Sequence, residues 1–166
     1  MNRRQYFSGK ARIREYRTLE IYHPAIGIQR FVYGRLDPLV ATLELSAPRN
    51  GGQAVSFIGG AFEFKKPDQQ SATVRADIQL GNVGQKVKQQ LKSINGSARA
   101  QTGEVVYREF LAGSLGAPEF VLRLFITSIT LKDGGVVIRA EQDNPSDRQI
   151  ADFYTSDRFP GLAESI

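Results

Sequence analysis

Residues 73–94 constrain the fold more than any other stretch, because their hydrophobic pattern changes there from a period of two to a helical period. In residues 73–80, TVRADIQL, apolar and polar side chains alternate strictly from Val74 to Leu80. Such alternation predicts a strand with one face buried and the other in water. Gly81 breaks the pattern, and we place the end of the strand there.

A helix is predicted directly after this strand, over residues 82–94. Asn82 is a favourable N-cap residue, and a run of helical periodicity follows it. Residues four apart lie on one face of a helix, so the apolar ones form a stripe that we expect to pack onto a β-sheet core. The packing residues are Val83, Val87 and Leu91.

Most of the remaining chain is predicted to form short strands separated by turns. Apolar, β-branched and aromatic residues dominate these segments, and glycine, proline and asparagine fill the gaps between them. Asp133-Gly134 lies between the last two segments and predicts a hairpin. The further strand segments are residues 19–22, 28–33, 40–45, 55–58, 61–64, 104–111, 121–131 and 136–140.

These elements predict a mainly β fold with one helix. The pattern favours an antiparallel β-sandwich or barrel with one flanking α-helix. Such a fold leaves strand edges, and an edge is a template for pairing with another chain.

The composition is that of a single globular domain without disulfide bonds. The chain has 166 residues, of which 41% are hydrophobic and 23% charged, and this length suits one domain with its own core. Cysteine is absent, which excludes disulfides, thiolate zinc sites and cysteine nucleophiles. No apolar run approaches the length of a membrane span, so we expect no membrane insertion. The N-terminus lacks the apolar region of a secretory signal.

Charge is distributed unevenly along the chain. Residues 1–18 hold six basic residues and one acidic residue, whereas six acidic and two basic residues follow from Glu141 to the end. We therefore divide the chain into a basic N-terminal arm, residues 1–17, and a single β domain, residues 18–166, with an acidic C-terminal segment. Nucleic-acid contact, attraction between neighbouring copies and a solvated terminus are all open roles for the arm. Its candidate contact residues are Arg3, Arg4, Arg12, Arg14 and Arg17.

The acidic C-terminal segment also carries apolar side chains. They amount to more apolar surface than a free tail normally exposes. We expect them to dock onto the sheet of the same domain, onto an adjacent subunit or onto a neighbouring protein. These side chains are Phe153, Tyr154, Phe159 and Leu162.

The sequence carries no enzyme signature. His23 is the only histidine, and it precedes Pro24 in a predicted turn, so no metal cluster of histidines can form. We expect a surface or turn histidine, and a role as a general base is the open alternative. The glycine-rich segments 48–53 and 57–62 lack the lysine and the following helix of a phosphate-binding loop. We predict no catalytic residue, no metal site and no cofactor, and we interpret the protein as not an enzyme.

Three segments carry a family resemblance: TLEIYHPA at residues 18–25, AFEFKKPDQQSATVRADIQLGNVGQKVKQQL at residues 61–91, and the closing YT…FPGL pattern at residues 154–162. In this order and spacing they resemble a family of small minor tail or tail-tip proteins of tailed bacteriophages, catalogued as a domain of unknown function. The resemblance spans residues 18–162, so it implies nothing about the basic arm.

The resemblance implies a structural virion protein that is made in the host bacterial cytoplasm and located at the tail tip. Distal tail and hub proteins of such phages have a tail-tube-like fold, and their subunits pair strands in a ring around the tail lumen. The implied role is a ring-forming subunit that joins the tail tube to the tip complex. The implied partners are copies of itself, as a hexamer or alternatively a trimer, and the tail tube, tape measure and central tail-tip or hub proteins. DNA would pass through the lumen only as cargo.

An alternative from a different class is a small soluble β-domain that binds nucleic acid through its basic head. Interleaved basic and aromatic residues in the arm favour this function. The strands carry no RNP-like aromatic motif, which disfavours it. Mass measurement of the purified protein, with and without its tail neighbours, separates the two hypotheses.

Overall fold

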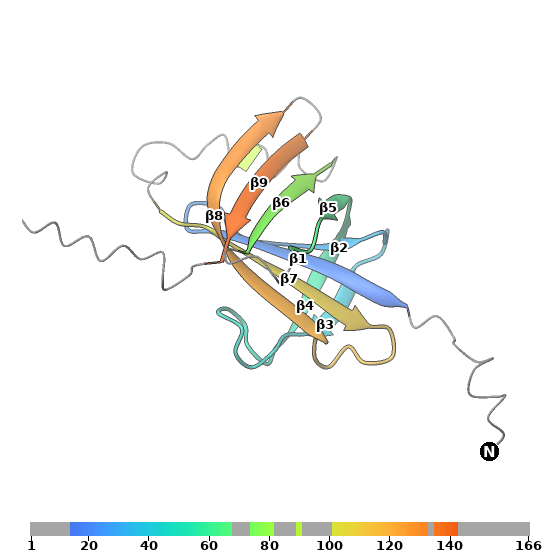
Figure 1. Cartoon of the computed structure of the whole chain (residues 1–166). Helices are drawn as coiled ribbons and strands as arrows, with labels where there is room; N and C mark the ends of the chain where they lie inside the picture. The colour runs from blue at the N-terminus through green and yellow to red at the C-terminus, as the bar shows by residue number, and fades with distance from the viewer. Residues whose placement is uncertain (1–13, 68–73, 82–88, 91–100, 133–134, 143–166) are drawn as a thin grey trace, which may run out of the picture.

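The protein is mainly β: nine strands form one mixed sheet that is not closed (Figure 1). The computed structural model describes residues 14–67, 74–81, 89–90, 101–132 and 135–142, and all nine strands lie within these ranges. Along the sheet the strand order is β3-β4-β2-β1-β7-β8-β9-β6-β5. The strands are β1 Glu15–His23, β2 Gly27–Tyr33, β3 Leu39–Thr42, β4 Ala54–Gly60, β5 Phe62–Phe64, β6 Arg75–Leu80, β7 Glu104–Leu111, β8 Phe120–Lys132 and β9 Gly135–Glu141.

Each predicted strand segment corresponds to one observed strand. β7 matches its prediction residue for residue, because its β-branched and aromatic run has sharp ends. β1 begins at Glu15, earlier than predicted, because Glu15 pairs with Leu111 of β7. The last residues of the predicted arm therefore belong to the sheet. The predicted β8–β9 hairpin is confirmed by the pairing of Lys132 with Gly135, although residues 133–134 lie outside the described part of the chain.

The prediction of a purely antiparallel sheet is wrong at one pair. β2 and β4 run parallel, with Phe31 opposite Ile58 and Tyr33 opposite Gly60. The chain leaves β2, forms the antiparallel β3–β4 pair, and returns alongside β2 in the same direction. A period of two places side chains on faces but carries no information on strand direction, so the sequence pattern did not predict this pair.

The predicted helix over residues 82–94 lies almost wholly outside the described residues. Gln89 and Gln90, the two described residues within it, have helical conformation. The packing residues Val83, Val87 and Leu91 lie outside, so the helix remains a prediction. No helix in the described ranges is long and apolar enough to cross a membrane.

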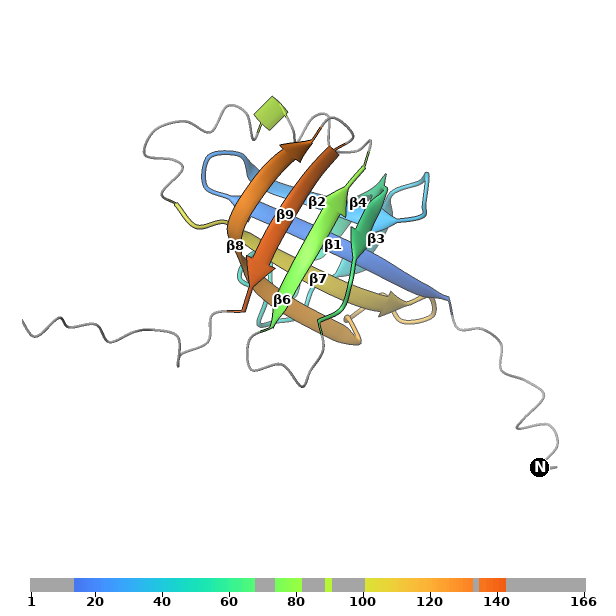
Figure 2. The same ribbon diagram turned by 45° about the horizontal axis from the view of Figure 1, so that its top comes forward.

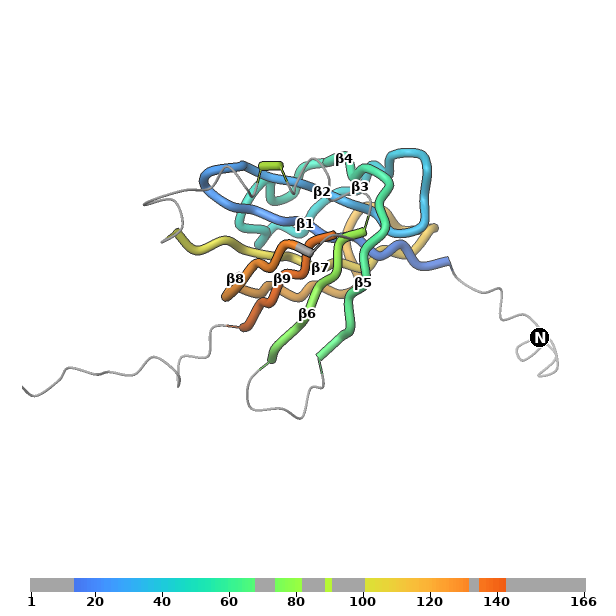
Figure 3. The backbone as a smooth tube through the Cα atoms, turned by 90° about the horizontal axis from the view of Figure 1, so that it is seen from above, coloured from blue at the N-terminus to red at the C-terminus, as the bar shows by residue number. Residues whose placement is uncertain are grey.

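β8 connects the two halves of the sheet. Its first part, up to Phe125, pairs with β7, and the part from Phe125 onward pairs with β9. The register shifts between Ile126 and Ser128, and a β-bulge of this kind bends a strand. The bend carries β8 from a layer with β1, β2 and β7 into a layer with β5, β6 and β9, and the second layer crosses in front of the first in Figure 2. Seen from above, the tubes of β5, β6 and β9 lie below those of β1 and β2 in the view (Figure 3).

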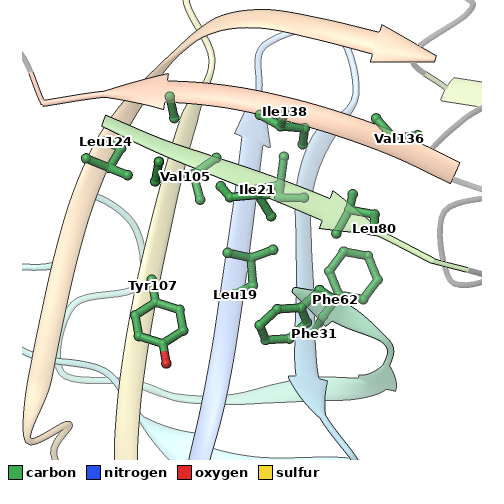
Figure 4. Close-up of a cluster of buried hydrophobic side chains, with 13 residues drawn as sticks. Leu19, Ile21, Phe31, Phe62, Leu80, Val105, Tyr107, Leu124, Val136 and Ile138 are labelled. Carbon is green, nitrogen blue, oxygen red and sulfur yellow. The ribbon is translucent and has the colours of Figure 1, made fainter. Parts of the chain in front are cut away.

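The first hydrophobic core fills the space between these two layers (Figure 4). Every strand except β3 and β4 contributes to it. Burying one large apolar side chain stabilises a fold by roughly 1.5–3 kcal/mol, so this core holds the two layers together. Its buried members are Leu19, Ile21, Phe31, Phe62, Ala76, Ile78, Leu80, Val105, Tyr107, Leu124, Val136, Ile138 and Ala140.

A second core lies on the opposite face of β2 and β7. Strand alternation explains the division: Phe31 points into the first core, and the next residue, Val32, points into the second. β3 and β4 cover this face. The buried members are Val32, Leu39, Ala41, Leu43, Val55, Phe57 and Phe110.

Candidate interaction surfaces

A cluster of charged side chains lies beside the second core, and we call it the charged cluster. Its members come from β1, β2, β7, β8 and the segment between β3 and β4. Burying charges is unfavourable unless they are paired, so the arrangement of acids and bases matters. The members are Glu20, Arg30, Glu44, Arg49, Glu104, Arg108 and Arg123.

Arg108 is the centre of the charged cluster. Its side chain is fully buried, as is that of Glu20. The guanidinium group donates two hydrogen bonds to Glu44, from Nε to Oε2 at 2.8 Å and from NH2 to Oε1 at 2.9 Å. Its NH1 atom lies 3.5 Å from Oε2 of Glu20. A planar guanidinium group is suited to such a two-point contact with a carboxylate.

Two further arginines join the charged cluster to the loop between β3 and β4. Arg30 donates from Nε to Oε2 of Glu20 at 2.8 Å and from NH2 to Oδ1 of Asn50 at 2.7 Å. Arg49 lies in the loop itself, and its guanidinium group stacks on Tyr22 at 4.0 Å. NH2 of Arg49 is 3.5 Å from Oε1 of Glu20, an oxygen that accepts no hydrogen bond from the described residues. The loop is thereby fixed onto β1 and β2.

Glu104 closes the cluster at its outer end. Arg49 donates to its Oε2 at 3.0 Å, and Arg123 donates to both of its oxygens, at 3.2 and 2.9 Å. Burial acts to raise the pKa of Glu104, but the hydrogen bonds and charges of Arg123 and Arg49 outweigh it and lower the pKa below its ordinary value. We assign a structural role to the charged cluster, because its carboxylates are held against guanidinium groups.

His23 ends β1 and is buried, so the expectation of a surface or turn histidine is correct only for its place next to the turn. Nδ1 accepts a hydrogen bond from the Ala25 amide at 3.1 Å, and Nε2 lies 3.2 Å from the carbonyl oxygen of Gln101. Nδ1 thus fixes the turn after β1, and Nε2 connects this turn to the segment before β7. The described residues contain no group of histidine, aspartate and glutamate side chains arranged to hold a metal ion.

Tyr107 lies where β5 packs against β7. Its ring stacks on Phe64 with centroids 4.1 Å apart, and its hydroxyl donates to Oε1 of Glu109 at 2.7 Å. Burial first, and then this hydrogen bond, raise the pKa of Tyr107 above its ordinary value. Lys66 holds the other oxygen of Glu109 at 2.7 Å. These contacts join β5, an end strand of the sheet, to the opposite layer.

The outer face of β3 and β4 is exposed and carries no charge, and we call it the uncharged face. Val40 is 59% exposed and Ile58 47% exposed. Leu36, just before β3, is fully exposed. Exposed strands normally carry lysine or another charge that prevents pairing with other chains. The outward-facing residues are Val40, Thr42, Ala54, Ser56 and Ile58.

β3 is an end strand of the sheet, and one side of its backbone faces away from β4. The Thr42 amide points to that side and donates to the Leu115 carbonyl at 2.8 Å. Backbone groups of residues two apart point to the same side of a strand, so the amide and carbonyl of Val40 also face outward. β5 is the other end strand. The sheet therefore presents two unlike edges.

Arginine and tyrosine side chains stack where β1 begins and β2 ends, in one group on each face of the sheet. Arg14 and Arg35 lie over the ring of Tyr16, at 5.6 and 5.0 Å from its centroid. Arg17 lies over the ring of Tyr33 at 4.3 Å. Stacking of this kind orders a guanidinium group while its N–H edge stays available to a partner. The members of the two groups are Arg14, Tyr16, Arg17, Tyr33 and Arg35.

Of the predicted contact residues, the structure describes Arg14 and Arg17, and it places them on opposite faces of the sheet. Arg14 stacks on Tyr16 beside the second core, and Arg17 stacks on Tyr33, which packs on Phe62 of the first core. The others lie outside the described residues, and their predicted roles are untested. They are Arg3, Arg4, Arg12, Phe153, Tyr154, Phe159 and Leu162.

Arg35 and the charged cluster were not predicted from the sequence. The position of Arg35 near Tyr16 could have been predicted from the β1–β2 hairpin. Thr18 pairs with Val32, so continuing the same register places residues near 16 beside residues near 34. The charged cluster gave no local signal, since Glu20 and Arg108 are 88 residues apart.

Comparison with known proteins identifies a family. A search of curated proteins finds no match to the chain. One family profile, described as a domain of unknown function (DUF1833), matches residues 3–142, which include all nine strands. This match covers most of the chain, and the protein therefore belongs to the DUF1833 family of domains of unknown function.

Proposed function

We propose that the protein is a structural, non-enzymatic subunit of a bacteriophage tail tip, in which copies form a ring that joins the tail tube to the tip complex. The segments that resemble small phage tail proteins support this proposal. Two of them, residues 18–25 and 61–91, fall within the family match. In this proposal the sheet, which β8 bends into two layers, is a tail-tube-like sandwich or barrel, and the predicted helix over residues 82–94 flanks it.

The observation that carries the proposal is the open sheet with two unlike edges, β3 and β5. A contact between unlike surfaces is heterologous, and repeated contacts of this type close into a ring when the rotation between subunits permits. Strand edges supply backbone donors and acceptors for such a contact. The ring would be a hexamer, or a trimer if the subunit belongs to the hub.

The uncharged face strengthens the case for β3 as a contact strand. Val40 and Ile58 offer apolar surface next to the outward backbone groups of β3. A lysine at this place would prevent pairing, and the described chain carries none between Leu36 and Gly60. The further proposed partners are the tail tube, tape measure and central tip proteins, with DNA as cargo in the lumen.

Native mass spectrometry of the full chain, alone and with its tail neighbours, tests this function. The expected result is a closed oligomer, and Val40→Lys is expected to shift it to monomer by placing a charge at the β3 edge. Thr130→Lys, an exposed change on β8, is the matched control and should leave the oligomer intact. A chain that stays monomeric under every condition contradicts the proposal, as does an oligomer that Val40→Lys leaves unchanged.

The alternative function is nucleic-acid binding through the basic head. The observation in its favour is the stacking of Arg14, Arg17 and Arg35 on tyrosine rings, because guanidinium groups also bind phosphate. Fluorescence anisotropy with a single-stranded oligonucleotide tests it. Binding that weakens steeply with salt supports the alternative. Loss of binding in a variant with Ser at all three positions would locate the binding to these arginines.

A further inference from the structure

β5 is an end strand of the sheet, and among the described strands only β6 pairs with it. The Gly81 amide donates to the Ala61 carbonyl at 3.0 Å, so the backbone groups of Ala61 and of Glu63, two residues on, face β6. The amides and carbonyls of Phe62 and Phe64 therefore face away from β6. β5 thus offers two residues whose backbone can pair with a further strand.

A hollow of about 280 Å³ lies along this free edge. All three residues of β5 line it, together with Arg17 of β1, Tyr33 of β2 and Tyr107 of β7. None of the described lining residues belongs to β6, so the hollow lies between β5 and the opposite layer. It therefore lies on the side to which the free backbone groups of β5 point. Because both layers bound it, the space suits a single extended chain.

Most of the walls of the hollow are aromatic. The rings of Phe64 and Tyr107 stack with centroids 4.1 Å apart, and those of Tyr33 and Phe62 meet edge to face at 5.7 Å. Since these rings hold one another in place, an apolar side chain can pack on them without first ordering them. A ligand with an apolar side chain therefore fits this hollow.

Two charged side chains complete the hollow, Arg17 and Glu63, and both are exposed. Arg17 lies over the ring of Tyr33 at 4.3 Å, and neither charged group forms an ion pair with a described residue. A guanidinium group held flat on a ring keeps its N–H fork at the rim, where it can meet a carboxylate. The hollow thus favours a ligand that carries both an acidic and a basic group.

An antiparallel strand added to β5 would have a defined register. Its residues opposite Phe62 and Phe64 exchange backbone hydrogen bonds with them, and the residue between these two lies opposite Glu63. Antiparallel pairing is slightly more stable than parallel pairing, and β5 pairs in this way with β6. Three successive residues of the ligand are therefore placed, in chain order, opposite Phe64, Glu63 and Phe62.

The surroundings of each position determine the side chain that fits it. The first position lies beside Tyr107, the ring that stacks on β5, and takes an apolar side chain. Directly opposed residues have their side chains on the same face, so a basic residue at the second position meets Glu63. The third position lies toward Tyr33 and the stacked Arg17, and takes a carboxylate. The pattern that fits is apolar, basic, acidic.

The described strands of a second copy do not supply this pattern. Only β3 and β5 have a free edge. On β3 the Thr42 amide already donates to Leu115, and Pro38 has no N–H, so Val40 is the single free donor. A second β5, in the register that pairs both phenylalanines, would place two Glu63 carboxylates opposite each other, and like charges there are unfavourable. These contacts favour a different protein as the partner.

We propose that the edge of β5 binds an extended segment of a different protein, which adds to the sheet as an antiparallel strand. The segment carries the pattern apolar, basic, acidic, and its three side chains contact Tyr107, Glu63 and Arg17. This inference goes beyond the proposed function. It leaves β3 as the contact strand of the ring and assigns the other edge of the sheet to a partner outside the ring.

Fluorescence anisotropy with a labelled synthetic peptide tests this contact. The full chain is titrated into the end-capped peptide Thr-Thr-Val-Lys-Glu-Thr-Thr, and saturable binding is expected. The same peptide with Lys and Glu exchanged is expected to bind about tenfold more weakly, because each charge then meets a like charge. A peptide N-methylated at Glu loses a backbone donor and is also expected to bind more weakly. Absence of binding, or equal binding of the three peptides, overturns the proposal.

Variants of the protein locate the site. Arg17→Ser is expected to weaken binding of the first peptide about tenfold, and Arg17→Lys less, because Lys keeps the charge but not the planar fork. Glu63→Lys is expected to reverse the preference at the second position, so that Val-Glu-Glu binds better than Val-Lys-Glu. Arg139→Ser is the control, since this side chain is 70% exposed and lies on β9. Equal affinities in all variants overturn the proposal.

Native mass spectrometry of the same samples separates this contact from the ring. Peptide bound to an oligomer that stays intact supports a partner outside the ring. A peptide that dissociates the oligomer shows that a second copy occupies the edge of β5, and this overturns the proposal. A chain that stays monomeric and still binds the peptides in the expected order removes the ring and leaves the β5 contact in place.

Discussion

Arg108 and Glu44, 64 residues apart in the chain, form a two-point ion pair with N–O distances of 2.8 and 2.9 Å. Arg108 lies on β7, and Glu44 follows β3, so the pair fixes the β3–β4 end of the sheet onto its centre. Since β3 is an end strand, this buried pair helps to determine where a free edge of the sheet lies. The charged cluster thereby holds in place the strand that we propose as a contact edge, β3.

Arg108→Met is expected to lower the free energy of unfolding by about 3–5 kcal/mol. The substitution leaves the buried carboxylate of Glu20 and that of Glu44 without their shared guanidinium partner. Urea unfolding at neutral pH measures the loss. Arg123→Met is the matched control, because its side chain is 45% exposed, and a loss of at most about 1 kcal/mol is expected. Equal losses in the two variants would contradict the central role of Arg108.

Glu104 is expected to make the stability depend on acid pH. Its pKa is lower in the folded protein than the ordinary value of 4.5, so its contribution is fully present above that pH and is lost as pH falls through the lowered folded pKa. The free energy of unfolding of the wild type should exceed that of Glu104→Gln by about 1 kcal/mol at pH 7, and this difference should disappear in acid. Unfolding curves at several pH values measure it. Exposed Glu63→Gln is the control, and a gap that persists at low pH would indicate lost packing instead.

Gly59→Ala is expected to destabilise the parallel β2–β4 pair. A Cβ atom at position 59 would meet the carbonyl oxygen of Arg35, so the turn after β2 must move. Overpacking of this kind costs about 1–3 kcal/mol. Gly113→Ala is the matched control, because a Cβ there meets nothing within 4 Å. Thermal unfolding compares the two, and identical melting temperatures would argue against this close approach.

The predicted helix over residues 82–94 has its own test. Leu91→Asp is expected to prevent folding, because the stripe of Val83, Val87 and Leu91 is predicted to lose its largest apolar side chain and to bury a charge against the sheet. Lys88→Asp, on a predicted outward face, is the control. Circular dichroism and solubility report the outcome. A Leu91→Asp variant with unchanged melting would contradict the helix assignment.

Local patterns were sufficient to predict the strands. Alternation in β6 and the β-branched run of β7 determine which side chains are buried, since a strand turns successive residues to opposite faces. The turn after His23 and the β8–β9 hairpin followed from turn residues in the same way. The excess of charge in the head pointed to Arg14 and Arg17 as contact residues; the structure stacks them on Tyr16 and Tyr33, and their role in assembly stays a prediction.

Pairings between distant segments decided the rest. The parallel run of β4 beside β2, the open sheet order and the stacking of Arg35 on Tyr16 depend on which strands meet, and hydrophobic periodicity carries no information on that choice. The burial of Arg108 is the clearest case. Its position within a strand is evident from the sequence, but its carboxylate partners come from β1 and from the segment after β3. A buried charge is tolerated only where such partners converge, and convergence across many residues of chain is a property of the tertiary structure.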